Sequence, residues 1–148
     1  MKIRHATLAD VPQLVSMSME FYPLTSYSKY APFDLETVQE LTVNIVQHGI
    51  YLVGELDGKI EGMLAVILVP FIFNKNITTA HEVVLWVNPS AQKSGIGRAL
   101  VKRADELRLL RGVKAFQMVR LSTSPAILDD VYVSLGFQPS EFCFTKVN

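Results

Sequence analysis

The spacing of the hydrophobic residues changes along the chain. A short strand is predicted over residues 2–6, and the rest of the first third has hydrophobic residues at helical spacing. Thr7 is predicted to begin a helix, with Asp10 in capping-box position. Asp34 is predicted to begin a second helix that ends at Gly49. The apolar faces of these two helices carry Val11, Leu14, Val15, Ser18 and Phe21, and Leu35, Val38, Leu41, Thr42 and Ile45. Between them, residues 21–33 are rich in aromatic residues and contain two prolines, so no long regular element is expected there.

The middle of the chain is β-branched and apolar, which predicts a meander of strands. Residues 50–55 and 59–69 are separated by Asp57-Gly58, a strong hairpin signal. Residues 74–76 (Asn-Lys-Asn) are predicted to form the next turn, and residues 78–87 the returning strand.

The last third alternates helices and strands. Ile96, Leu100, Ala104 and Leu107 form an apolar stripe at helical spacing, and Gly112 ends that helix. Residues 113–119 are predicted to be a strand, Ser124-Pro125 to begin another helix that ends at Gly136, and residues 137–147 to form one or two strands. The predicted order is β-α-α-β-β-β-α-β-α-β. It indicates an α/β fold with a mixed sheet and helices on both faces.

The string Gln92-Lys-Ser-Gly95-Ile-Gly97 lies between the strand at 83–87 and the helix after it. Such a glycine turn presents free backbone N–H groups at the positive end of the helix dipole, which predicts an anion site. A Walker A loop is excluded, because Arg98-Ala99 follows Gly97 where Lys-Ser/Thr is needed. A dinucleotide fingerprint is also excluded, because Leu100 occupies the position of its third small residue.

Composition narrows the classes of protein. A length of 148 residues with 49% hydrophobic and 19% charged residues indicates one globular domain over 1–148. The 14 basic and 14 acidic residues form no run of one sign, which disfavours a nucleic-acid surface. The only cysteine, Cys143, excludes an intrachain disulfide and a zinc cluster and is expected to be a buried thiol; no metal site is predicted. Because no segment reads as a signal peptide or a membrane span, we expect no membrane association and a cytoplasmic protein.

Two motifs together resemble a known family. Gln92-x-x-Gly95-x-Gly97 resembles the pyrophosphate loop of the GCN5-related N-acetyltransferase (GNAT) family. The stretch from Tyr132 to Gly136-Phe137 resembles the Tyr-x-x-x-Gly-Phe signature of the same family, 35 residues after Gly97. The element order and the length agree with this resemblance, which covers the whole chain. It implies a GNAT fold, transfer of an acetyl group from acetyl-CoA to a primary amine, and attack in a ternary complex.

The resemblance also implies where acetyl-CoA binds. The pyrophosphate is expected on the loop, and the pantetheine arm beside the strand that precedes it. A backbone N–H of that strand is expected to stabilise the oxyanion. At the start of the last helix, where many family members have Asn, Ser124 stands and is expected mainly to cap the helix. The cofactor-binding residues are therefore predicted to be Leu85, Trp86, Val87, Gln92, Lys93, Ser94, Gly95, Ile96, Gly97, Arg98, Ala99 and Ser124.

Acetyl transfer to an amine needs a base and an acid. The resemblance points to Tyr132 as the acid, and the helical pattern places it beside a buried stripe of Ile127, Leu128, Val131 and Leu135. The base is left open. His81 has the strand parity of Leu85 and Val87 and is slightly favoured. Glu82 has the wrong parity unless a β-bulge intervenes. A water relay or an already neutral amine would need neither residue.

The acceptor is expected between the first two helices. Tyr22, Tyr27 and Tyr30 are candidate walls of its site, and Glu20, Asp34 and Glu141 are candidate partners for a cationic amine. Both a small-molecule amine and a protein amine remain open as acceptors, and so does a homodimer. The alternative function is a non-catalytic acetyl- or acyl-CoA-binding sensor or regulatory module, which would keep the glycine loop and lose the acid and the base.

Overall fold

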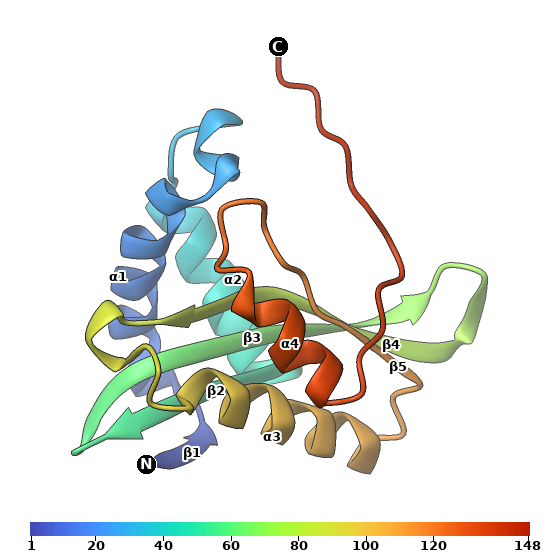
Figure 1. Ribbon diagram of the computed structural model, residues 1–148, viewed down its shortest axis with the longest axis horizontal. Coiled ribbons are helices and arrows are strands. Elements are labelled where there is room, and N and C mark those ends of the chain that lie inside the picture. The colour runs from blue at the N-terminus through green and yellow to red at the C-terminus, as the bar shows by residue number, and fades with distance from the viewer.

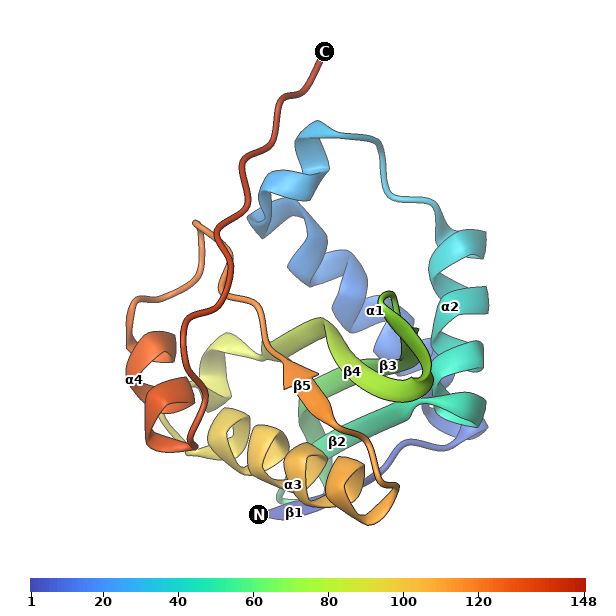
Figure 2. The ribbon, with the colours of Figure 1, turned by 90° about the vertical axis from the view of Figure 1, so that its right-hand side faces the viewer.

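The computed structural model describes residues 1–148 as a five-stranded sheet with helices on both faces (Figures 1 and 2). The strands are β1 (Lys2–His5), β2 (Ile50–Leu56), β3 (Lys59–Phe71), β4 (Asn74–Val87) and β5 (Ala115–Gln117), and they lie in the order β1-β2-β3-β4-β5. The first four pair antiparallel, and β5 is parallel to β4. The sheet is therefore mixed, as the sequence predicts.

Four α-helices complete the fold: α1 (Val11–Phe21), α2 (Leu35–His48), α3 (Ile96–Leu110) and α4 (Ile127–Ser134). The 3-10 turns are η1 (Leu8–Asp10), η2 (Tyr22–Leu24), η3 (Ser26–Lys29) and η4 (Pro89–Ala91). The predicted cap of the second helix is confirmed, because the Asp34 carboxylate accepts a hydrogen bond from Thr37 N at 2.9 Å and Gly49 ends the helix. No helix has the length and the apolar character that a membrane crossing requires.

Alternate residues of the central strands supply two apolar cores. On one face, Leu52, Leu64 and Val66 are fully buried against Leu100 and Val101 of α3. On the other face, Val53, Met63 and Ala65 pack with residues of α1 and α2. Burial on both faces explains why the sequence of these strands is apolar almost throughout.

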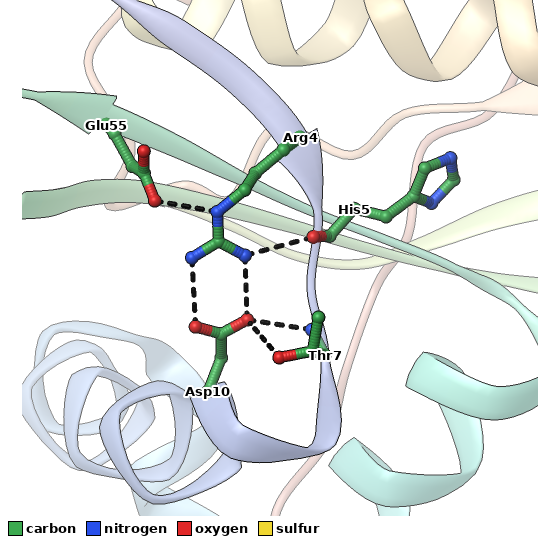
Figure 3. Close-up of polar contacts among 5 residues, drawn as sticks. All are labelled: Arg4, His5, Thr7, Asp10 and Glu55. Atoms are coloured by element: carbon green, nitrogen blue, oxygen red, sulfur yellow. Dashed lines mark hydrogen bonds and ion pairs between the residues drawn. The ribbon is translucent and has the colours of Figure 1, made fainter. Parts of the chain in front are cut away.

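An ion-pair cluster ties the start of the chain to the sheet (Figure 3). The Arg4 guanidinium donates to both carboxylate oxygens of Asp10, at 2.8 and 3.0 Å, and to Glu55 Oε1 at 2.6 Å. Asp10 in turn accepts a hydrogen bond from Thr7 N at 2.7 Å. This contact confirms that Thr7 and Asp10 pair at the start of η1, and it links β1, η1 and β2.

The prediction of a strand over residues 137–147 is wrong. Beyond Phe137 the chain forms no strand and leaves the body of the molecule (Figures 1 and 2). The side chains of Phe142 and Phe144 are 84% and 97% exposed. Cys143 is exposed as well, so the prediction of a buried thiol is also wrong. An alternating pattern becomes a strand only where a neighbouring strand supplies hydrogen bonds, and this segment has no such neighbour.

Several boundaries also differ from the predictions. The strand predicted over residues 113–119 is shorter in the structure, where β5 covers only Ala115–Gln117. The turn predicted at residues 74–76 lies instead at residues 72–73, because β3 and β4 continue to pair past Pro70 with a register shift. Helix α4 begins at Ile127 with Ala126 as its N-cap, so Ser124 and Pro125 lie before the helix and Ser124 does not cap it. The hairpin at Asp57-Gly58 is confirmed, and both residues have positive φ, 50° and 77°.

Candidate active site

The glycine loop connects η4 to α3 through two residues in left-handed conformations. Lys93 has φ 75° and Gly95 has φ 85°. This backbone turns the chain so that Ile96, which is 1% exposed, enters the core as the first residue of α3. The backbone of Ile96 therefore belongs to the end of the loop, while its side chain packs in the core and anchors the helix.

Four backbone N–H groups of this loop have no acceptor within the protein: those of Lys93, Gly95, Gly97 and Arg98. Ile96 N, in contrast, donates to Ser94 Oγ at 3.3 Å, and Ala99 N donates to the Gly95 carbonyl at 3.0 Å. N–H groups at a helix start attract anions because they carry the positive end of the helix dipole. The loop therefore offers the donor set that a pyrophosphate requires.

Two side chains hold the loop in place. Gln92 Nε2 donates to the Val87 carbonyl at 3.3 Å, which ties the loop to the end of β4. The Arg98 guanidinium donates to Ser134 Oγ, which joins the first turn of α3 to the last turn of α4. Arg98 and Lys93 are exposed beside the free N–H groups, so their positive charges add to the attraction for an anion.

Strand β4 has an unpaired edge directly before this loop. It pairs with β3 along its whole length, but with β5 only over Thr79–His81, opposite Ala115–Gln117. Beyond that point the chain after β5 leaves β4, which runs on toward the glycine loop (Figure 1). The backbone of Val83–Val87 thus has no partner strand on the side of β5, and we call the place where β4 and the chain after β5 diverge the splay. An open strand edge can pair with an extended, amide-bearing ligand arm.

A β-bulge in β4 decides which side chains face this region. Ala65 of β3 pairs with Val84 and the next residue, Val66, pairs with Glu82, so Val83 is an extra residue. Glu82 therefore shares the face of Val66 and Leu85, on the side of α3. His81 pairs with Ile67 and faces the side of α1 and α2. The expectation that His81 shares the parity of Leu85 and Val87 is wrong, because the bulge reverses the alternation.

Glu82 is a partly buried carboxyl group that accepts hydrogen bonds from the backbone. Its Oε2 accepts from Val119 N at 2.8 Å. Burial raises the pKa of Glu82 to about 7, while the hydrogen bonds from the backbone of Val119 and Leu85 oppose that rise. A carboxyl group with a pKa near neutrality can take up and release a proton under physiological conditions. His81 Nε2 lies 2.9 Å from Thr79 Oγ1 instead.

Tyr132 is the most buried residue of α4, with 8% of its surface exposed. Its hydroxyl donates to the Val119 carbonyl at 3.1 Å, and its ring lies against Phe137. Burial raises the pKa of Tyr132, and the nearby charges of Glu82 and Asp129 raise it further. The expected helix face is partly wrong, because Ile127 is 62% exposed and Tyr132 takes a core position. A buried phenol that keeps its proton suits an acid.

The three predicted acceptor tyrosines occupy the turns after α1, and they differ in their contacts. The Tyr22 hydroxyl donates to the carbonyl groups of Tyr27 and Ala31, so it braces its own loop. Tyr27 and Tyr30 stack edge to face with ring centroids 5.6 Å apart. Burial raises the pKa of Tyr27, with a further contribution from the charge of Glu82. The charge of Glu82 thus acts on Tyr27.

The three predicted acidic partners for an amine are all exposed: Glu20, Asp34 and Glu141. The Asp34 carboxylate is already engaged by Thr37 as the cap of α2, and these hydrogen bonds lower its pKa. Ser124 lies in the turn before α4, where its amide donates to the Leu121 carbonyl at 2.9 Å. Trp86 faces the α1 side of the sheet, because its ring packs on Phe21 with centroids 5.7 Å apart.

Val119 bonds to both Glu82 and Tyr132, and it was not among the site residues predicted from the sequence. Its side chain is 45% exposed, and its two contacts are made by backbone atoms. Backbone contacts leave no residue-type signal in a single sequence. The sequence offered only the prediction of a strand over residues 113–119; the structure ends that strand at Gln117, and Val119 lies two residues beyond it.

Solved structures with the same fold are numerous. A transcriptional regulator from Bacillus halodurans is 25% identical with a TM-score of 0.77, covering 98% of this chain and 97% of the other. A predicted acetyltransferase with acetyl-CoA from Clostridium acetobutylicum is 17% identical with a TM-score of 0.75, covering 99% and 95%. The aminoglycoside acetyltransferase meta-AAC0020 from an uncultured soil sample, in complex with trehalose, is 20% identical with a TM-score of 0.70, covering 98% and 95%. These likenesses agree with the fold predicted from the sequence.

No curated protein matches the chain by sequence. A family model does match: the acetyltransferase (GNAT) domain model aligns with residues 47–139, well over half of the chain. The matched region contains the bulged strand, the glycine loop and Tyr132. The chain therefore belongs to the GNAT acetyltransferase family, and acetyl transfer is its general chemistry.

Proposed function

We propose that this protein transfers an acetyl group from acetyl-CoA to a primary amine, by direct attack in a ternary complex. The observation that carries the proposal is the juxtaposition in one region of the free N–H groups of the loop, the open edge of β4, and the pair Glu82 and Tyr132. Each of these features answers one chemical requirement of the transfer.

The first requirement is cofactor binding. The N–H groups of Lys93, Gly95, Gly97 and Arg98 would hold the pyrophosphate at the start of α3. The edge of Leu85–Val87 would pair with the amides of the pantetheine arm. The splay leaves this edge free, which supports acetyl-CoA as the co-substrate.

The second requirement is acid and base chemistry. Glu82, directly or through a water molecule, would take a proton from the ammonium, and the neutral amine would attack the thioester carbonyl. A backbone N–H of β4 would stabilise the oxyanion of the tetrahedral intermediate. Tyr132 would give its proton to the thiolate as the carbon–sulfur bond breaks, so that CoA leaves as the thiol. The attacking nitrogen would lose its second proton, through water, to the Tyr132 phenolate, and Glu82 would release its proton to solvent, which restores both groups. The bulge supports Glu82 over His81, because Glu82 lies on the face of Leu85.

The third requirement is a site for the acceptor. Tyr27 and Tyr30 would form walls of its site, and exposed Glu20 and Glu141 would attract a cation. A small-molecule amine is the first class to test, since aminoglycoside acetyltransferases share the fold. A protein amine, a homodimer and the cytoplasmic location stay predictions.

The test is thiol release from acetyl-CoA with a panel of aminoglycosides, polyamines, simple amines and lysine peptides. With the preferred acceptor, Tyr132→Phe should lower kcat by about 10²-fold or more. The matched control is Tyr51→Phe, which removes a hydroxyl from another buried tyrosine with a raised pKa, on the opposite face of the sheet. Tyr51→Phe should leave kcat nearly unchanged.

Two results would contradict the proposal. Equal activity of the wild type and Tyr132→Phe would remove the acid role. Tight binding of acetyl-CoA without turnover of any acceptor would favour the alternative, a sensor or regulatory module. A similar structure named as a transcriptional regulator is the observation that keeps this alternative under test.

A further inference from the structure

Val119 follows β5 and lies between the two proposed catalytic side chains. Its N–H donates to Glu82 Oε2 at 2.8 Å, and its carbonyl accepts from the Tyr132 hydroxyl at 3.1 Å. One residue therefore joins a side chain of β4 to a side chain of α4. Both hydrogen bonds use backbone atoms of Val119, so the backbone makes the connection.

The place of Val119 in the sheet explains this arrangement. His81 and Gln117 form the last paired position of β4 and β5. Two residues beyond Gln117, the Val119 N–H would need a backbone carbonyl of β4 to continue the ladder. The carboxylate of Glu82 accepts that hydrogen bond instead. The Glu82 side chain thus replaces the backbone acceptor that a continued strand would supply, at the point where the splay begins.

We infer that Val119 is a positioning residue whose N–H holds the carboxylate of Glu82 and whose carbonyl holds the hydroxyl of Tyr132, so that base and acid are fixed relative to each other. The inference rests on the proposed function for the roles of those two side chains. Val119 connects these two side chains through its backbone atoms alone. A shift of the segment after β5 would move both groups together.

The charges around Glu82 determine what loss of this contact would do. Tyr27 of η3 and Tyr132 of α4 are the titratable groups that its charge influences, and Cys143 and Asp129 act on those tyrosines in turn. His81 faces the other side of the sheet. No cation compensates the burial of Glu82, so its backbone hydrogen bonds are what favour the ionised form. Removal of the Val119 donor should therefore make Glu82 a weaker acid.

The experiment compares Val119→Pro, which removes the N–H, with Val119→Ala, which keeps it. The observable is the pH dependence of the Glu82 carboxyl ¹³C shift in glutamate-labelled protein, assigned by its absence in Glu82→Gln. The wild type and Val119→Ala should titrate with a midpoint of about 7. Val119→Pro should titrate about one pH unit higher, as expected for loss of one hydrogen bond to a charged group. Identical midpoints in the two variants would overturn the inference.

A second measurement does not depend on the folding of the proline variant. In the ¹⁵N-labelled wild type, the Val119 amide shift should titrate with the same midpoint as the Glu82 carboxyl, and this titration should vanish in Glu82→Gln. An amide that does not respond to pH would also overturn the inference.

Measurements of activity distinguish a failure of this inference from a failure of the proposed function. If the inference holds, kcat of Val119→Pro falls more than kcat of Val119→Ala, while KM for acetyl-CoA is the same in both. Full activity of Glu82→Gln beside intact NMR titrations would refute the role of Glu82 as base and leave the contact itself established. A loss of activity in Glu82→Gln with no NMR coupling would refute the inference alone.

Discussion

Glu82 and Leu85 lie on the same face of β4, although three positions separate them, because Val83 is bulged out of the ladder with β3. In an unbroken strand an odd separation places two side chains on opposite faces. The bulge therefore brings a carboxyl group to the side of the sheet that carries α3 and α4. It also turns His81 toward the side of α1 and α2.

The bulge leads to a prediction for the two rival bases. Glu82→Gln should lower kcat by about 10²- to 10⁴-fold, the range for loss of a general base. His81→Gln should keep most of the activity, because His81 faces the other side of the sheet and contacts Thr79. In the wild type, kcat/KM should rise as the pH increases through about 7, because burial raises the pKa of Glu82 to that value and the base must be unprotonated. Steady-state kinetics from pH 5 to 9 would measure all three. A large loss in His81→Gln with little change in Glu82→Gln would reverse the assignment.

The glycine loop leads to a prediction with a matched control. Gly95 and Gly58 both have positive φ, 85° and 77°, and a Cβ added at either would meet no atom within 4 Å. Replacement of either by alanine should cost similar stability, about 1–2 kcal/mol, since the strain is that of a left-handed conformation. Only Gly95→Ala should weaken acetyl-CoA binding, by about tenfold, which corresponds to roughly 1.4 kcal/mol.

Thermal unfolding and calorimetric titration with acetyl-CoA would check both parts of this prediction. The loop would lose its role as the anion site if both variants bound acetyl-CoA as tightly as the wild type. Equal weakening in Gly58→Ala, at the remote β2–β3 hairpin, would show that general destabilisation causes the effect.

The ion-pair cluster leads to a prediction for stability at acidic pH. The hydrogen bond from Arg4 lowers the pKa of Asp10 to about 2, below its usual 3.8. The folded state therefore favours ionised Asp10, and this stabilisation is complete above about pH 4 and is lost as the pH falls toward 2. Asp10→Asn should lower the free energy of unfolding by about 1–2 kcal/mol at pH 7, after allowance for partial solvent screening. Urea unfolding at pH 7, 4 and 3 should show the difference shrinking with acid. A constant difference would contradict this electrostatic account.

The exposed C-terminal segment leads to a prediction for Cys143. Because this thiol is exposed, it should react with Ellman's reagent in the native protein at the rate of a free cysteine. Unfolding in guanidinium chloride should change that rate little, and Cys143→Ser should abolish the reaction. Strong protection in the native protein would show that the segment packs against another surface in solution.

Much of the fold could be predicted from one sequence because its signals are local. Several of these signals depend on residues a few positions apart: the cap of the 3-10 turn before α1 at Thr7, the cap of α2 at Asp34, the hairpin at Asp57-Gly58 and the stripe from Ile96 to Leu107. The two glycines of the loop and the motif at Tyr132 identified the family for the same reason. The strand over residues 137–147 was predicted from alternation alone, and alternation does not say whether a partner strand is present.

The sequence by itself determined most of the elements, the anion loop and the short set of ionisable residues available to the site. The tertiary structure decided how those residues face one another. An extra residue in β4 reversed the parity of His81 and Glu82, the divergence of β5 opened the edge of β4, and the backbone of Val119 came to lie between Glu82 and Tyr132. The physical reason is that strand register, strand divergence and backbone hydrogen bonds depend on partners distant in the chain, whereas helix caps, turns and apolar stripes are set by neighbours in sequence.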